Sequence, residues 1–233
     1  MLHTNLFDDV ASRLDSQVNP YVSKLMEGQL DGTLPITYGP ALDGMKGKWI
    51  NKFPERLKEN KLILEIGCHK GKTIIEMAKA FPDLNFIGMD ITFKRVVMTA
   101  QRAKKADLDN VAVILGSAKQ LDSIVADHEL DGVIIFFPDP WSKKKQAKNR
   151  LINRQFSEIL ARKVKKSGFL WFKTDKKEYF DESCNHLKLN GFMDTLVPNS
   201  LCRQTFESTF ERKFRLEKLP IYEKTWVNSS NII

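Results

Sequence analysis

Cysteine is scarce in this sequence. Three cysteines lie far apart in a chain of 233 residues, and no two of them form a CxxC pair. An odd number at such spacing predicts neither a disulfide framework nor a zinc site. The four histidines form no pair with metal-ligand spacing either, so we expect no metal.

Long apolar runs are also missing. No segment approaches the roughly 20 consecutive apolar residues that a membrane-spanning helix needs. The N-terminal stretch MLHTNLFDDVASRLD is acidic and amphipathic and lacks the apolar centre of a signal peptide. These absences predict a soluble, cytoplasmic protein without membrane contact.

Acidic residues are outnumbered by basic ones. The chain carries 37 lysines and arginines against 29 aspartates and glutamates, a formal net charge of +8. This excess favours a polyanionic partner, but many basic proteins bind none, so charge alone identifies no ligand. With 42% hydrophobic residues, the chain has enough apolar side chains for a sizeable core.

The sequence changes character near residue 60. Residues 1–60 mix proline, glycine and asparagine with scattered apolar residues, which is typical of an N-terminal extension with short turns. In residues 61–233, β-rich runs alternate with amphipathic helices. We expect strands at 61–67, 84–90, 110–116, 131–137 and 168–175, and helices at 72–81, 92–106, 147–164 and 177–192. This alternation predicts an α/β, Rossmann-like domain with a mainly parallel central sheet and helices on both faces.

Polar side chains lie at the carboxyl ends of all five expected strands. They are Glu65, Asp90, Ser117, Asp139 and Asp175. The carboxyl ends of parallel strands meet at one edge of a sheet, and ligands bind there near the point where the strand order reverses. Loops are polar in general, but four acids at five consecutive strand ends indicate a ligand site.

The first strand leads into the turn LEIGCHKG. Gly67 and Gly71 bracket this turn, and small residues let a backbone approach a ligand. The GxGxxG dinucleotide fingerprint is absent, which disfavours a nicotinamide enzyme. Asp90 ends the second strand, where a carboxylate commonly binds ribose hydroxyls. The alternative is that Asp90 caps the helix that starts near Thr92.

Five segments carry a specific resemblance. They are FIGMD, FFPDPWSKKKQAKNRL, KTDKKEY, STFERKF and LPIYEKTW, and the match spans about residues 61–227. In order and spacing they resemble the bacterial tRNA (guanine-N7-)-methyltransferases, which are class I methyltransferases. The resemblance implies S-adenosylmethionine as the methyl donor, tRNA as the partner, and methyl transfer to N7 of guanosine 46. It leaves the oligomeric state open between monomer and homodimer.

The resemblance also implies two groups of site residues. The donor contacts are Glu65, Gly67, Asp90, Ser117 and Asp139, and Asp139 is also the catalytic acid. The substrate contacts are Lys143, Arg150, Asp175, Ser208, Thr209, Phe210 and Glu211.

This chain departs from the family pattern at three positions. His69 stands where the donor loop is expected to have a second glycine, Ser117 replaces an acid, and Ser208 replaces a threonine. A side chain at His69 could crowd the methionine part of the donor. Ser117 can still hydrogen-bond an adenine amino group, more weakly than a carboxylate.

The reaction explains why one acid follows an apolar strand. Guanine N7 carries no proton, so its attack on a sulfonium methyl needs no general base, and catalysis is chiefly orientation and electrostatics. Asp139 can accept hydrogen bonds from the amino and imino edge of guanine and offset the charge that develops on the ring. Pro138 and Pro140 stiffen its loop. Trp141 either stacks on a base or packs as an ordinary core aromatic.

A basic segment follows Asp139. From Lys143 to Lys166 there are ten lysines and arginines and one acid, Glu158. Such runs are usually solvated helix faces, but the adjacent strand-end acid predicts a phosphate-binding surface beside the reaction centre. For Arg150 the alternative is a structural ion pair.

Two other functions are open at this point. PDPW faintly resembles the loop that binds an exocyclic amine in amino-methyltransferases, although its residue order and the STFERKF segment argue against that reading. A catalytically weak or inactive RNA-binding protein on a methyltransferase fold would account for His69 and Ser117.

Overall fold

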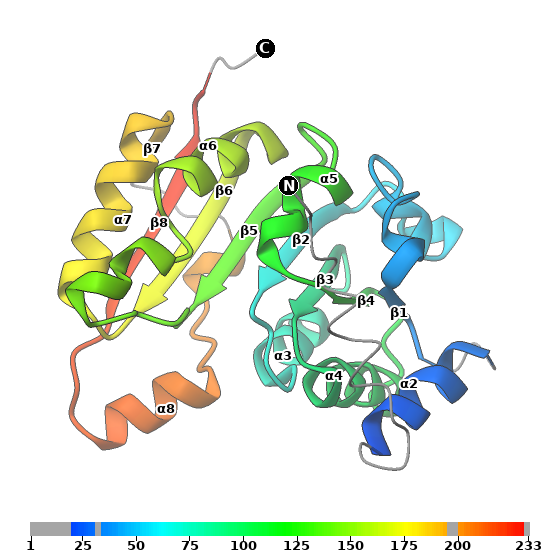
Figure 1. Cartoon of the computed structure of the whole chain (residues 1–233). Helices are drawn as coiled ribbons and strands as arrows, with labels where there is room; N and C mark the ends of the chain where they lie inside the picture. The colour runs from blue at the N-terminus through cyan, green and yellow to red at the C-terminus, as the bar shows by residue number, and fades with distance from the viewer. Residues whose placement is uncertain (1–19, 31–33, 195–199, 231–233) are drawn as a thin grey trace, which may run out of the picture.

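The computed structural model describes residues 20–30, 34–194 and 200–230. Within these ranges a sheet of eight strands has the order β1-β4-β3-β2-β5-β6-β8-β7 (Figure 1). The strands are β1 (Ile36–Tyr38), β2 (Lys61–Ile66), β3 (Leu84–Asp90), β4 (Val111–Leu115), β5 (Leu130–Phe136), β6 (Val164–Thr174), β7 (Phe192–Asp194) and β8 (Tyr222–Asn228). Only β8 runs against its neighbours β6 and β7, so the sheet is mainly parallel, as expected.

Helices cover both faces of this sheet. The helices are α2 (Pro20–Leu30), α3 (Lys72–Ala80), α4 (Phe93–Lys105), α5 (Leu121–Ile124), α6 (Arg154–Lys163), α7 (Lys177–Leu189) and α8 (Thr209–Leu216). Side chains of α2, α3 and α4 pack with Ile134 and Phe136 in one apolar cluster. Side chains of α5, α6 and α7 pack with Val133 and Ile135 in the other. Successive strand residues point to opposite faces, which is why β5 needs a continuous apolar run.

The strand order reverses between β2 and β5. From β2 the chain proceeds to β3 and β4 on one side, and from β5 to β6 on the other. The carboxyl ends of β2 and β5 therefore flank the crevice where ligands bind in open α/β sheets. Figure 1 shows α8 below the carboxyl ends of β5 and β6.

Most elements expected after residue 60 are confirmed. The five strands are β2 to β6, and the helices at 72–81, 92–106 and 177–192 are α3, α4 and α7. The expected helix at 147–164 was wrong over residues 147–153, because α6 begins only at Arg154. Asn153 caps α6 by accepting a hydrogen bond from the backbone N–H of Phe156 at 2.9 Å. A cap and a buried charge at Arg150 override the apolar periodicity there.

The described part of the N-terminal extension packs on the domain. β1 adds to the sheet edge in parallel with β4. Trp49 and Phe53 are buried in the same cluster as β2 and β5, and the Trp49 indole donates to the carbonyl of Ile124 at 2.7 Å. Residues 1–19 lie outside the described residues, so the extension as a whole is not assigned a structure.

One glycine of the central sheet generates a stability prediction. A Cβ at Gly132 on β5 would lie 2.1 Å from the ring of Phe169 on β6, which is itself buried. We predict that Gly132→Ala lowers the free energy of unfolding by about 1–3 kcal/mol through overpacking. Urea denaturation measures this. Gly44→Ala is the control, because a Cβ there meets nothing within 4 Å; equal losses in both variants would contradict the packing argument.

Candidate functional site

A narrow hollow lies at the carboxyl ends of β2 and β5. Its free volume is about 20 Å³, which is room for about one water molecule. The lining comprises Glu65, Gly67, Cys68, His69, Lys70, Lys72, Thr73, Phe136, Ser208, Thr209 and Phe210. Five residues that we expected to contact the methyl donor or the substrate thus meet at the crevice that the strand order creates. They are Glu65, Gly67, Ser208, Thr209 and Phe210.

Glu65 supplies a buried carboxyl group to this hollow. Its side chain is 4% exposed, and Oε2 has no hydrogen-bond partner in the described structure. Burial, with a smaller contribution from the nearby Asp90, raises the pKa of Glu65 to about 8. An unpaired buried carboxyl is costly, so its presence here fits a ligand that carries a donor or a positive charge.

The turn after β2 leaves space above its backbone. Gly67 has φ +82°, and a Cβ added there would meet no atom within 4 Å. Gly71 has φ +73°, and a Cβ there would lie 2.6 Å from the side chain of Thr99 on α4. Gly71 is therefore required for packing, whereas Gly67 keeps open the space that a ligand can enter.

Asp90 ties this turn to the start of α4. Its carboxylate accepts the backbone N–H of Thr92 at 2.9 Å and that of His69 at 3.1 Å, and Arg95 lies 3.4 Å away. The helix-start contact that we considered as the alternative is thus present. A carboxylate has about four lone-pair sites, so one remains for a ribose hydroxyl.

His69 adopts the backbone conformation that glycine favours. Its φ is +52°, and its ring meets the ring of Phe210 edge-on with centroids 5.4 Å apart. Burial, followed by the charges of Arg95 and Lys70, lowers the pKa of His69, which keeps the imidazole neutral at pH 7. The side chain connects the turn after β2 to α8.

The loop after β5 holds Asp139 in a strained backbone. Phe137 and Trp141 on either side of it have φ of +50° and +44°. Such conformations persist where the surroundings fix them, and they cluster at functional sites. Asp139 is exposed, and within the described ranges its carboxylate has no hydrogen-bond or ion-pair partner. It is free to contact a substrate.

Arg150 fixes this loop from inside the protein. It is 3% exposed, its Nε donates to the carbonyl of Pro140 at 3.0 Å, and its guanidinium pairs with Glu178 and Glu182 of α7. This is the structural ion pair that we kept as the alternative to RNA contact. Lys143, Lys145 and Lys148, in contrast, are exposed around the 3-10 helix η5 (Lys144–Asn149).

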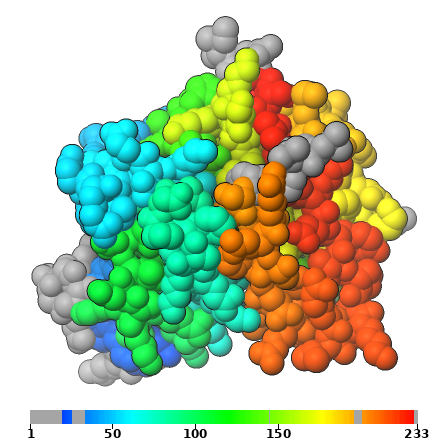
Figure 2. Space-filling model, turned by 180° about the vertical axis from the view of Figure 1, so that it is seen from behind, coloured from blue at the N-terminus to red at the C-terminus, as the bar shows by residue number. Residues whose placement is uncertain are grey.

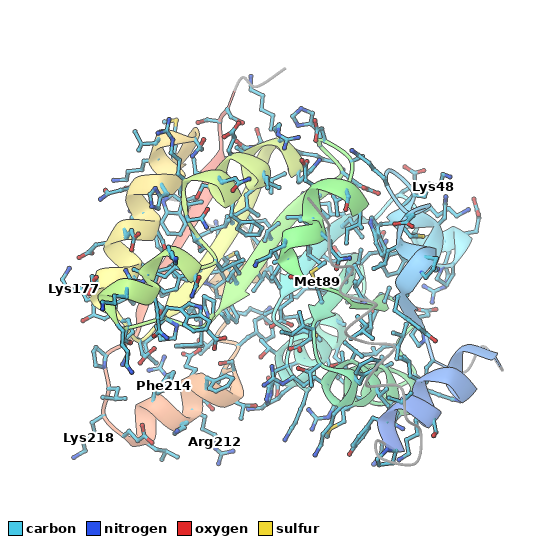
Figure 3. All side chains as sticks on the ribbon, in the orientation of Figure 1. Lys48, Met89, Lys177, Arg212, Phe214 and Lys218 are labelled. Atoms are coloured by element: carbon cyan, nitrogen blue, oxygen red, sulfur yellow. The ribbon has the colours of Figure 1, made fainter. Side chains whose placement is uncertain are left out.

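α8 forms the remaining wall of the site. Ser208 caps it by accepting the backbone N–H of Glu211 at 3.0 Å, while Thr209 and Phe210 are exposed. Glu211 is fully buried against Lys173 of β6, at 3.0 Å. Phe214 points from α8 toward the sheet and meets Phe137 at 5.3 Å, whereas Arg212 and Lys218 point away from it (Figure 3).

Two expected site residues make other contacts. The Ser117 hydroxyl accepts the backbone N–H of Lys119 at 3.3 Å and caps the short 3-10 helix η4 (Ala118–Gln120). Asp175 pairs with Lys176 at 2.7 Å after the end of β6. Neither lines the hollow at β2 and β5.

Sequence reasoning missed Lys173 and Phe214. A lone lysine inside the apolar run GFLWFKT was a signal for the first, because charged residues are almost never fully buried unless paired. No signal marked Phe214 as a contact of the loop after β5. From behind, α8 and the residues before it lie against α3 (Figure 2), where Lys72 donates to the carbonyl of Glu207 at 3.3 Å.

Neither a membrane helix nor a metal group is found in the described ranges. No helix there is long and apolar enough to cross a membrane. The same residues bring together no group of three or more histidine, cysteine, aspartate or glutamate side chains that could hold a metal ion.

Solved methyltransferase structures share this fold. The 16S rRNA methyltransferase KamB superposes with a TM-score of 0.56 at 11% identity, covering 83% of this chain and 95% of that one. An antibiotic-related methyltransferase gives a TM-score of 0.51 at 19% identity, covering 76% and 88%. The expected Rossmann-like class I methyltransferase fold is confirmed.

Sequence comparisons identify the family. Residues 59–224 match a family described as "Putative methyltransferase". The tRNA (guanine-N(7)-)-methyltransferase of Bacillus licheniformis is 35% identical over 188 residues, covering 78% of this chain and 86% of the relative. That of Geobacillus thermodenitrificans is 33% identical over 187 residues, covering 78% and 85%. The chain belongs to the tRNA (guanine-N(7)-)-methyltransferase family.

Proposed function

We propose that this protein transfers a methyl group from S-adenosylmethionine to N7 of guanosine 46 in tRNA. The observation that carries the proposal is the shared edge of β2 and β5. There the unpaired carboxyl of Glu65 and the open space at Gly67 lie beside the loop that presents the exposed Asp139. Family membership supports the same reaction.

The donor-binding residues are Glu65, Gly67, Asp90, Ser117 and Asp139. S-adenosylmethionine, when bound, supplies an activated methyl group on a positively charged sulfur. Glu65 offers a carboxyl without a partner to a cationic ligand, and Gly67 lets that ligand approach the backbone. Asp90 has one lone-pair site left for a hydroxyl after its contacts with His69, Thr92 and Arg95.

Asp139 holds the target base. Because guanine N7 already carries its lone pair, the residue need not remove a proton from it. The Asp139 carboxylate accepts hydrogen bonds from the amino and imino edge of the base, which orients N7 and offsets its developing charge. Arg150 and the two prolines keep the loop in place while this contact forms.

The exposed lysines after Asp139 bind the RNA backbone. Lys143, Lys145 and Lys148 lie beside the loop that presents Asp139, so they neutralise phosphates next to the target nucleotide. Thr209, Phe210 and Asp175 complete the proposed substrate surface. The protein acts in the cytoplasm as a monomer or homodimer.

Nucleoside analysis tests the proposed reaction. The protein is incubated with labelled S-adenosylmethionine and unmodified tRNA, and the tRNA is digested. We expect label in N7-methylguanosine at position 46. Asp139→Ala should lose activity by at least about 100-fold, the scale of a lost transition-state contact, with an unchanged melting temperature because Asp139 is exposed.

Three results would contradict this proposal. Label in an exocyclic amine would favour an amino-methyltransferase. Tight tRNA binding without any label would favour the inactive RNA-binding alternative. Near wild-type turnover by Asp139→Ala would remove the role assigned to that residue.

Glu65 makes stability depend on pH in a defined direction. Its pKa is about 8 in the folded protein, above the usual carboxyl value of 4.5, so folding favours the protonated form. The stabilisation is present at low pH and is lost as pH rises to about 8. We predict that Glu65→Gln removes this decline in the unfolding midpoint between pH 5 and pH 8.

Donor binding should have the opposite pH dependence. A cationic ligand favours ionised Glu65, so binding below pH 8 releases a proton and becomes tighter as pH rises toward 8. Calorimetry with S-adenosylmethionine in two buffers of different ionisation enthalpy measures the released proton. Equal proton release by the parent and Glu65→Gln would contradict this assignment.

The lysines and Arg150 should respond differently to substitution. Each of Lys143→Ala, Lys145→Ala and Lys148→Ala should flatten the plot of log binding constant against log salt by about 0.7–0.9. Arg150→Ala instead removes a buried side chain that donates to the carbonyl of Pro140 and packs on Tyr179, so it should lower the unfolding midpoint. Unchanged salt slopes in all three lysine variants would place the RNA surface elsewhere.

A further inference from the structure

The proposed reaction needs two loops at fixed positions. They are the donor turn after β2 (residues 67–71) and the acid loop after β5 (residues 137–141), and α8 touches both. Phe210 meets His69 of the donor turn, and Phe214 meets Phe137 of the acid loop. The two phenylalanines are four residues apart, so they lie on one face of the helix. The position of α8 therefore sets the relation between the two loops.

We propose that the buried ion pair Lys173–Glu211 is the anchor that positions α8, and that Glu211 is a positioning residue rather than a contact for RNA. This inference rests on the proposed function, because it concerns how the same site is assembled. Lys173 is the penultimate residue of β6, and Glu211 is in the first turn of α8.

The pair is enclosed on all sides. Lys173 is 2% and Glu211 0% exposed. The Lys173 ammonium lies 4.9 Å from the ring centres of both Phe136 and Trp171, and it also reaches Glu223 of β8 at 3.5 Å. Side chains from β5, β6, β8 and α8 thus surround the Lys173 ammonium group.

Both oxygens of Glu211 are already engaged. Oε2 accepts from Lys173 at 3.0 Å, and Oε1 accepts from Arg215, one turn further along α8, at 2.6 Å. A carboxylate with no exposed surface and two cationic partners cannot contact RNA unless the anchor breaks. The exposed Thr209 and Phe210 beside it remain available for substrate.

An ion pair here defines geometry more than it adds stability. Replacing a buried pair by apolar residues is often neutral, whereas removing one partner is strongly destabilising because a charge stays buried alone. The pair holds one point of α8 against one point of β6, and two apolar side chains of similar volume at these positions can hold the same point. This contact places Phe210 against His69 and Phe214 against Phe137.

The test compares Glu211→Ala with Glu217→Ala. Glu217 follows α8 and contacts exposed Lys213 at 3.8 Å, outside the anchor. In Glu211→Ala we expect amide hydrogen exchange in residues 209–216 to accelerate on the order of 100-fold, as the anchored helix opens. The kcat should fall on the order of 100-fold through misplacement, and any rise in KM for tRNA should occur together with the faster exchange, because Thr209 and Phe210 move with the helix. Glu217→Ala should match the parent.

A double variant provides the rescue. Lys173→Met with Glu211→Leu leaves no unpaired buried charge, so it should fold even where Glu211→Ala does not. We expect it to restore slow exchange in α8 and to recover most of the kcat. A raised KM for tRNA in Glu211→Ala with exchange unchanged would make Glu211 a substrate contact and overturn the proposal. A double variant with slow exchange but no activity, or with exchange as fast as in Glu211→Ala, would also overturn it.

The exchange measurement separates this inference from the proposed function. If the parent protein forms no N7-methylguanosine, the proposed reaction is wrong, and exchange in α8 still reports whether the pair anchors the helix.

Discussion

The reversal of strand order between β2 and β5 is the constraint on which the site depends. It opens a crevice at the carboxyl edge of the sheet, and the three parallel strands β2, β5 and β6 all end at that edge. Glu65 and the glycine turn lie at the end of β2, and Phe136 and the loop of Asp139 lie at the end of β5. Lys173 lies at the end of β6, where it pairs with Glu211 of α8. Residues separated by more than a hundred positions become neighbours because parallel strands end together.

Two buried acids at this edge are suited to different roles because their surroundings differ. Glu65 and Glu211 are both removed from water. Glu65 Oε2 has no partner, and burial, followed by the nearby Asp90, raises the pKa of the group, which makes its ionisation responsive to a cationic ligand. Glu211 has two cationic partners and a fixed position. The unpaired acid is suited to binding, and the paired acid is suited to holding a helix in place.

The sequence was sufficient for the strands β2 to β6 and for α3, α4 and α7, because apolar runs such as Val133–Phe137 and helical apolar stripes depend on local periodicity. It was insufficient where tertiary contacts determine the structure. β8 is placed by its pairing with β6, and α8 by the ion pair with Lys173, and neither contact produces a periodic pattern in the sequence. For Arg150 both RNA contact and a structural ion pair were open, since a sequence does not say which arginine is buried. His69 was recognised as unusual for its turn, but its contact with Phe210 needed the fold.

The location of the donor beside Gly67 is the central claim, and calorimetric binding of S-adenosylhomocysteine to Gly67→Ala tests it most directly. A methyl group at Gly67 would enter the open space that we assign to the ligand, so affinity should fall at least about tenfold, or 1.4 kcal/mol. Unfolding stability should fall by only about 1 kcal/mol, from the left-handed backbone at that position. An affinity equal to that of the parent protein would contradict the account, because the donor would then bind away from the turn after β2.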